Sequence, residues 1–210
     1  MIGTVLYLLA AATAPIGQPP PQATRLSLPF AGVWGVIQGF DSGDTHTGYA
    51  AYALDFVPAQ PRGARPPRRG APLTRFVCFG RPVLAPADGT VVVAHGGARD
   101  WPAYVKGKDE GNYVILQHAP GEYTEFRHLE ARSVKVHVGD HLRRGDVLGR
   151  CGNSGNATTP HLHVGFLSSI DPITTRMMTL SGYEVLGPDG GWRAGTGTPA
   201  QGEILRPFKP

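Results

Sequence analysis

The sequence is poor in the features that mark helical bundles and helical zinc proteases. Only 17% of its 210 residues are charged, and no long stretch repeats apolar residues with the helical period. The signature HExxH, which places two zinc-binding histidines on one helix, is absent. No internal repeat is present either. These absences exclude a helical zinc protease and argue against a helical bundle.

Glycine and proline, in contrast, are abundant, with 29 and 20 residues. This composition favours a turn-rich β protein. Strand-like segments recur along the chain, at 52–57, on both sides of a turn at 88–89, at 112–118, at 123–129 and in two short pieces within 133–152. We therefore predict an all-β fold, an antiparallel sandwich or open barrel with long loops.

The chain divides into four parts by composition. Residues 1–14 form an apolar run that ends in "ATA", which is typical of a cleaved export signal and too short for a membrane span. Residues 15–27 are proline-rich and indicate a linker, residues 28–170 a single domain, and residues 171–210 a turn-rich extension packed on the outside. An uncleaved tail or a buried first strand is the alternative for the apolar run. With the signal removed, we expect a secreted or periplasmic protein without a membrane span.

The net charge is +4, and much of the basic excess lies in the segment "QPRGARPPRRGAPLTR" at 60–75, which has five arginines and no acid. Such a loop is either attracted to a polyanion or is simply a solvated, proline-stiffened insertion. Because no aromatic residues alternate with the arginines, stacking on bases is not indicated, and we do not expect nucleic acid as a partner.

Two histidines two residues apart, in "TTPHLHVGF" at 158–166, are the first sign of chemistry. In a strand, His161 and His163 share one face while Leu162 and Val164 point to the other. Neutral imidazole is a common zinc ligand, so the pair suggests a metal site, although a polar strand face with two solvated histidines has the same pattern.

A catalytic zinc site needs a third protein ligand and one open position. The candidates are His46 in "DTHTG", Asp55 in "ALDFV" and His128 in "EFRHL". Asp41 and Asp44 are weaker substitutes for His46. The glycines of "GNSGN" would supply left-handed turns that aim the strand of His161.

Several of these segments occur in a characteristic order: "THTGYAAYALDF", "GRPVLAPADGTVV", "GNYVILQH", "EYTEFRHL", "VKVHVGDHLRRGDVLGRCGNSGN" and "PHLHVGF". Together they resemble the LytM/lysostaphin-type zinc metalloendopeptidases, a family of peptidoglycan hydrolases with a duplicated hybrid motif fold. The resemblance covers residues 28–170. One departure is the gap between His46 and Asp55, because many members of the family place this pair four residues apart.

The resemblance implies a role for each position. His46, Asp55 and His163 would bind one Zn²⁺ per chain, and His128 and His161 would act as catalytic groups that do not bind the metal. Two further expectations come from the sequence alone. Tyr123 and Asn112 could contact substrate, and Cys78 and Cys151 could form a disulfide in an exported protein or remain two small buried thiols.

The expected function is that of an exported, monomeric zinc metalloendopeptidase that hydrolyses peptide bonds of peptidoglycan by attack of zinc-activated water. One alternative is a non-catalytic LytM-like domain that binds peptidoglycan or activates a cell-wall amidase. Another is a β-barrel carrier or sugar-binding domain whose histidines are incidental.

Overall fold

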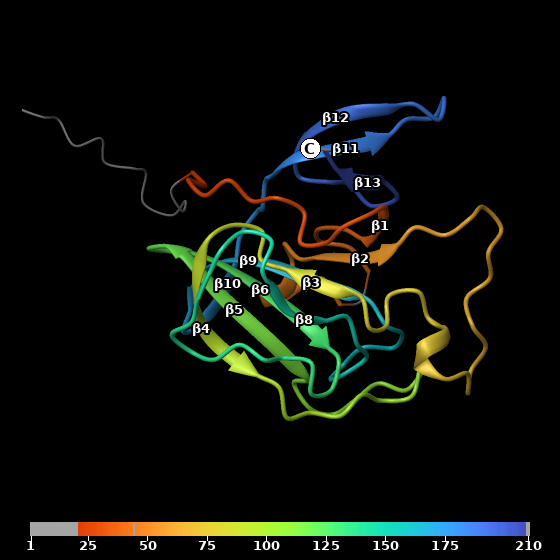
Figure 1. Cartoon of the computed structure of the whole chain (residues 1–210), viewed down its shortest axis with the longest axis horizontal. Helices are drawn as coiled ribbons and strands as arrows, with labels where there is room; N and C mark the ends of the chain where they lie inside the picture. The colour runs from red at the N-terminus through yellow and green to blue at the C-terminus, as the bar shows by residue number, and fades with distance from the viewer. Residues whose placement is uncertain (1–20, 44, 209–210) are drawn as a thin grey trace, which may run out of the picture.

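A computed structural model describes residues 21–43 and 45–208, whose regular secondary structure is almost entirely antiparallel strand (Figure 1). The strands are β1 (Trp34–Gln38), β2 (Leu54–Pro58), β3 (Pro82–Leu84), β4 (Gly89–His95), β5 (Asn112–Ala119), β6 (Glu122–Leu129), β7 (His141–Leu142), β8 (Val147–Arg150), β9 (Leu162–Ile170), β10 (Ile173–Thr175), β11 (Leu180–Leu186), β12 (Trp192–Gly197) and β13 (Ile204–Pro207). Two 3₁₀ turns, η1 (Gly48–Ala50) and η2 (Leu73–Arg75), interrupt the loops. The all-β prediction is confirmed.

Most strands belong to one long sheet, in the order β12-β11-β13-β1-β2-β9-β6-β5-β4-β7, with β10 paired to β9. Strand β9 lies between β2 and β6, so the histidine-bearing segment is in the middle of the sheet, beside strands from the first half of the chain. The segments on either side of 88–89 do not form a hairpin. Instead, β3 pairs with β8 in a separate two-stranded ribbon, while β4 pairs with β5 and β7.

The two faces of the central strands differ because strand side chains alternate. Leu54 on β2, Phe126 on β6, and Leu162 and Val164 on β9 point into the hydrophobic core, as does Val83 from the β3–β8 ribbon. The residues between them, such as Asp55 and His163, point to the opposite face. Burial of the apolar face therefore fixes which side chains reach the polar face.

The ends of the chain differ from the prediction. Residues 171–210, expected to be a turn-rich outer layer, contain β10 to β13, and β13 pairs with β1 so that β11 to β13 extend the same sheet (Figure 1). The C-terminal end of the expected linker at 15–27 packs against the domain: Leu26 is fully buried and forms a β-bridge to Leu180. The predicted export signal at 1–14 lies outside the described residues.

Cys78 and Cys151 are joined in a disulfide with a Cα–Cα distance of 5.7 Å. The bond links the loop before β3 to the residue after β8, and both cysteines are fully buried in the core. No helix in the part of the chain that the structure describes is long and apolar enough to cross a membrane.

Candidate metal centre and catalytic cleft

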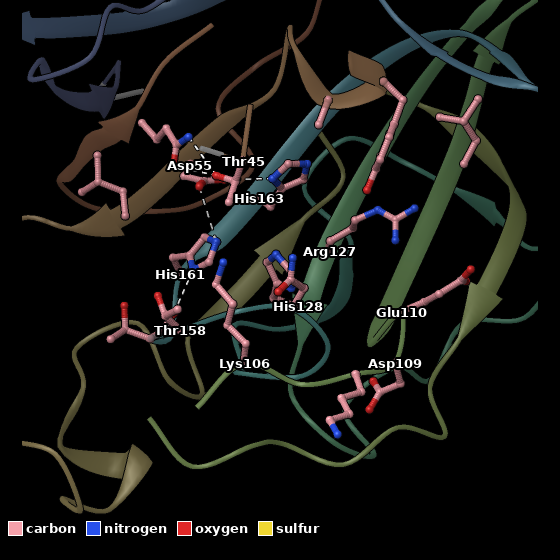
Figure 2. A pocket seen from close by; sticks show the side chains of 18 residues that line it. Thr45, Asp55, Lys106, Asp109, Glu110, Arg127, His128, Thr158, His161 and His163 are labelled. Carbon is pink, nitrogen blue, oxygen red and sulfur yellow. Dashed lines mark hydrogen bonds and ion pairs between the residues drawn. The ribbon is translucent and has the colours of Figure 1, made fainter. Parts of the chain in front are cut away.

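The polar face of the sheet brings together groups from three neighbouring strands. Asp55 on β2 lies directly opposite His163 on β9, and His163 lies directly opposite Arg127 on β6. Because adjacent strands are about 4.8 Å apart, these three side chains form a continuous row across the sheet. The row lies in a cavity of about 920 Å³ (Figure 2).

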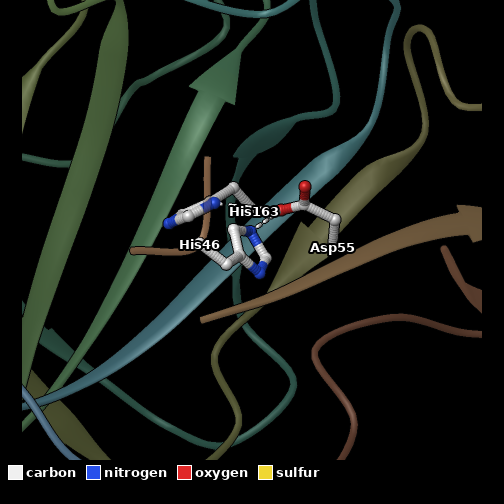
Figure 3. Close-up of side chains that lie close together, drawn as sticks. All are labelled: His46, Asp55 and His163. Carbon is white, nitrogen blue, oxygen red and sulfur yellow. Dashed lines mark hydrogen bonds and ion pairs between the residues drawn. The ribbon is translucent and has the colours of Figure 1, made fainter. Parts of the chain in front are cut away.

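Three side chains form the candidate metal centre: His46, Asp55 and His163. All three are buried, and one potential ligand atom from each lies within 4.8 Å of the other two (Figure 3). The Nε2 atom of His46 and the Nδ1 atom of His163 lie 3.2 Å and 2.9 Å from the same oxygen, Oδ1 of Asp55. Two imidazoles and a carboxylate are ligand types that zinc prefers.

The hydrogen bonds of His46 show why a cation fits this centre. Its Nδ1 atom lies 2.8 Å from the carbonyl oxygen of Gly39, which can only accept a hydrogen bond. Neutral His46 therefore carries its proton on Nδ1 and presents a lone pair at Nε2, toward Asp55. Nε2 is buried and has no hydrogen-bond partner in the described part of the chain. A metal ion between the lone pair and the carboxylate would satisfy both groups.

Two further imidazoles line the cavity next to this centre. Nε2 of His161 lies 3.5 Å from Oδ2 of Asp55, and its Nδ1 lies 2.7 Å from the carbonyl oxygen of Thr159. Nδ1 of His128 lies 2.9 Å from the carbonyl oxygen of Ser154. The ring centroids of His128 and His161 are 4.7 Å apart. In both rings the backbone carbonyl holds the proton on Nδ1 of the neutral form, which leaves a lone pair on Nε2.

His128 reaches the cavity through an uncommon backbone conformation. Consecutive residues of a regular strand point to opposite faces, yet Arg127 and His128 both line the cavity. The φ angle of His128 is 62°, in the left-handed region that residues other than glycine seldom adopt. This residue interrupts the alternation of β6 and turns its imidazole toward the site.

The charges at the site shift three pKa values. Burial raises the pKa of Asp55, but the charge of His161 and the contacts with His163 and His46 outweigh burial and hold this pKa well below its usual value. Burial lowers the pKa of His46, but its interactions with Asp55 outweigh burial and raise it. Burial and the neighbouring charges of His161 and His163 hold the pKa of His128 well below its usual value, so His128 is neutral.

The remaining predicted residues lie elsewhere. The Asn112 side chain is fully buried, where Nδ2 donates to the carbonyl oxygens of Ala98 and Leu129 and Oδ1 accepts from the Ala98 amide. Asn112 is thus part of the scaffold and, contrary to its predicted place, does not line the cavity. Tyr123 lies at the other end of β6 from His128, and its hydroxyl is 3.3 Å from Nε2 of Gln117. It does not line the cavity. Asp41 is not in the candidate metal group, and Asp44 lies outside the described residues.

Three cationic side chains that were not predicted also line the cavity, namely Lys106, Lys108 and Arg127. The first two come from the loop between β4 and β5. Strand alternation gave no signal for Arg127, because it places this residue on the face opposite its neighbour His128.

Residues 74–174 match the model of peptidase family M23. The chain contains a peptidase M23 domain. The matched segment includes His128, His161 and His163, whereas His46 and Asp55 precede it. Asp55 belongs to the site through the pairing of β2 with β9, and His46 comes from the loop between β1 and β2.

The M23 domain is also similar to individual proteins. It is 36% identical over 104 residues to an uncharacterised metalloprotease of Haemophilus influenzae, covering 48% of this chain and 20% of the relative. It is 33% identical over 103 residues to the peptidoglycan DD-endopeptidase ShyC of Vibrio cholerae, covering 48% and 23%. The chain thus spans less than a quarter of the length of these relatives. Among solved structures, lysostaphin of Staphylococcus simulans matches with a TM-score of 0.44 and 20% identity, over 68% of this chain and 47% of that one.

Proposed function

We propose that the M23 domain is a zinc-dependent endopeptidase that hydrolyses peptide bonds of bacterial peptidoglycan in the cell envelope. The observation that carries this proposal is the convergence of His46, Asp55 and His163 beside two more imidazoles in one open cleft. A domain that only bound peptidoglycan would have no need for this arrangement. The relatives ShyC and ShyA, named as peptidoglycan DD-endopeptidases, support the same substrate.

The three buried residues would hold the metal through His46 Nε2, an Asp55 oxygen and His163 Nδ1. A bound zinc ion would supply a positive charge and lower the pKa of a coordinated water to about 7. The Gly39 carbonyl fixes the ring of His46, so that its Nε2 lone pair faces the centre before any ion arrives.

The two other histidines would handle protons at their Nε2 atoms. The carbonyls of Thr159 and Ser154 hold Nδ1 of His161 and His128, so each neutral ring presents a basic Nε2 to the cleft. One ring can accept a proton from the attacking water, and a protonated ring can donate to the departing amine or to the developing oxyanion. Nε2 of His161 lies 3.5 Å from Oδ2 of Asp55, directly beside the proposed metal centre.

The decisive experiment is digestion of purified peptidoglycan. The full chain, loaded with zinc, is incubated with walls that have different cross-links, and the released peptides are identified by mass spectrometry. We expect new amino and carboxyl termini at one type of bond, and no release by Asp55→Ala. Zinc-loaded, folded protein that releases no peptide from any wall would overturn the proposal and favour a binding or activating role.

A further inference from the structure

Arg127 occupies a position next to the candidate metal centre that the proposed chemistry does not use. Its Cα is paired with that of His163, so its side chain leaves the sheet one strand away, at a backbone spacing of about 4.8 Å. The side chain is 12% exposed and lines the cavity that holds the histidines (Figure 2). A group bound by Arg127 would therefore lie within about one residue of a peptide bond at the centre.

The guanidinium group of Arg127 is held by its neighbours, but not all of its N–H donors have a partner. Nη2 lies 2.6 Å from Oε1 of Glu125, which is 1% exposed beneath it. The guanidinium carbon is 4.7 Å from the centre of the Tyr113 ring. Nε is buried and lacks a hydrogen-bond partner among the residues described. Since arginine offers five N–H donors, the contact with Glu125 orients the group and leaves donors for a ligand.

Other charges in the cavity favour an anion near Arg127. Lys106 and Lys108 line the same cavity, and Figure 2 shows the Lys106 side chain directed toward His161 and His128. Two acids of that loop also line the cavity, and one of them, Asp109, accepts hydrogen bonds from Trp101 Nε1 at 3.0 Å and from the Gly111 amide at 2.9 Å. The carboxylate of Glu110 lies 3.3 Å from the Tyr113 hydroxyl. Tyr113 is on β5, so it is separated from His163 by the strand of Arg127.

We propose that Arg127 binds a free carboxylate on the residue that supplies the nitrogen atom of the cleaved peptide bond. This inference rests on the proposed peptidase function. When the acyl-side residue is linked through its α-carboxyl group, that group is part of the bond, so a free α-carboxylate next to the bond belongs to the nitrogen side. It is present when that residue is a diamino acid linked through its side-chain amine, or is the C-terminal residue. It is absent within a glycine bridge.

Two matched cross-linked peptides test the proposal. They are identical except that the nitrogen-side residue carries a carboxylate in one and a carboxamide in the other. Wild-type protein should cleave the carboxylate peptide with a kcat/KM about 10- to 100-fold higher, the range expected for hydrogen bonds to a charged group. The preference should arise mainly from KM.

The variants must avoid leaving a buried charge unpaired. Arg127→Gln alone would leave the buried Glu125 carboxylate without its partner, and an unpaired buried charge is strongly destabilising. The double variant Glu125→Gln/Arg127→Gln removes both charges together and should reduce the carboxylate preference to about one. Arg127→Lys keeps the positive charge but loses the paired N–H donors that match a carboxylate, so it should retain part of the carboxylate preference. Lys135→Gln, an exposed cation in the loop between β6 and β7, is the control and should keep the wild-type ratio.

Failure of this inference is distinguishable from failure of the proposed function. If wild-type protein cleaves both peptides equally, or the double variant keeps the preference, Arg127 is not the carboxylate site. If wild-type protein cleaves neither peptide, calorimetric binding decides the matter. Tighter binding of the carboxylate peptide that disappears in the double variant would uphold the role of Arg127, and equal or undetectable binding of the two peptides would overturn it.

Discussion

Nδ1 of His163 lies 2.9 Å from Oδ1 of Asp55, although the two residues are 108 positions apart in the chain. The contact follows from the pairing of β2 with β9, which places the two Cα atoms directly opposite each other. Both side chains must leave the same face, because Leu54 and Val164 occupy the core on the other side. The candidate metal centre is therefore fixed by the strand register, and the loops contribute only His46.

The first prediction concerns metal retention. Asp55→Ala and His163→Ala should each reduce bound zinc from about one ion per chain to a trace, because each removes one of three protein ligands. Zinc is measured by mass spectrometry after gel filtration of protein prepared with zinc. Asp41→Ala, which changes an exposed carboxylate outside the metal group, is the control and should keep the ion. Retention of zinc by His163→Ala together with its loss from His161→Ala would reverse our assignment of the two histidines.

The second prediction separates metal binding from proton transfer. His161→Ala and His128→Ala should retain zinc but lower kcat by roughly 10²- to 10⁴-fold, the usual contribution of a positioned acid or base. Steady-state hydrolysis of a defined cross-linked peptide, with zinc content measured on the same samples, checks both statements. Full activity in both variants would remove these residues from the mechanism.

The third prediction concerns the disulfide. Cys78 and Cys151 are 73 residues apart, and closing a loop of this length lowers the entropy of the unfolded chain enough to stabilise the fold by about 4 kcal/mol. The double variant Cys78→Ser/Cys151→Ser should lose stability of this order in urea denaturation. A reducing agent should destabilise the wild-type protein to a similar extent and leave the double variant unchanged. An equal effect of the reductant on both proteins would contradict the role of this bond.

The fourth prediction concerns the close approach of two loops beside His128. The amide of Gly152 donates to the carbonyl oxygen of His128 at 2.9 Å, and a Cβ atom on Gly152 would overlap the backbone of Glu130. Gly152→Ala should therefore displace the end of β6, lower kcat and reduce stability by about 1–3 kcal/mol. Gly97→Ala is the matched control, because a Cβ there meets no atom within 4 Å. Equal activity and stability in the two variants would contradict the predicted clash.

The fifth prediction concerns acid sensitivity away from the site. Glu122 is buried on β6 and accepts hydrogen bonds from the amides of Ala23 and Thr24 at 2.6 and 2.8 Å. Burial raises its pKa, but hydrogen bonds from Thr24 and Ala23 outweigh burial and lower it. A lowered pKa in the folded state means that the stabilisation is complete above the unfolded-state pKa of about 4.3 and is lost as the pH falls through the folded-state value.

Glu122→Gln should therefore be less stable than wild type at pH 7, by about 1–3 kcal/mol, and the difference should shrink below about pH 4. Urea denaturation at a series of pH values measures both effects. Burial raises the pKa of the half-buried residue Glu130, so Glu130→Gln is a control in which this acid-dependent loss should be absent. A constant difference between wild type and Glu122→Gln from pH 7 to pH 3 would contradict the expectation.

Local patterns were sufficient for most strands of the main domain. The runs at 112–118 and 123–129 correspond to β5 and β6 within one residue, since each has strong strand propensity and a clear turn between them. The alternation of "HLHV" correctly predicted that Leu162 and Val164 face the core. The extension was harder to predict, because its strands are divided by glycine-containing turns, such as Asp189–Gly190, and owe their place to pairing with β1.

The expected left-handed turns of "GNSGN" show a similar division. Gly155 has a φ of 67°, as predicted for this run. Gly152, at its start, is instead required because the backbone of Glu130 is too close for a side chain. Gly152 and Glu130 are more than twenty positions apart in the sequence, so local turn preferences cannot predict this contact.

The sequence by itself determined the alternation of the strands, and with it the side of the sheet on which Asp55, His161 and His163 lie, because a period of two is a local property of an extended chain. Only the tertiary structure decided which other side chains lie beside these residues on the polar face of the sheet. It aligned Asp55 and Arg127 with His163 through strand register, turned His128 into the cleft through a left-handed φ, and withdrew Asn112 into the core. These outcomes depend on long-range pairing and on competition for space and hydrogen bonds, which a linear pattern does not contain.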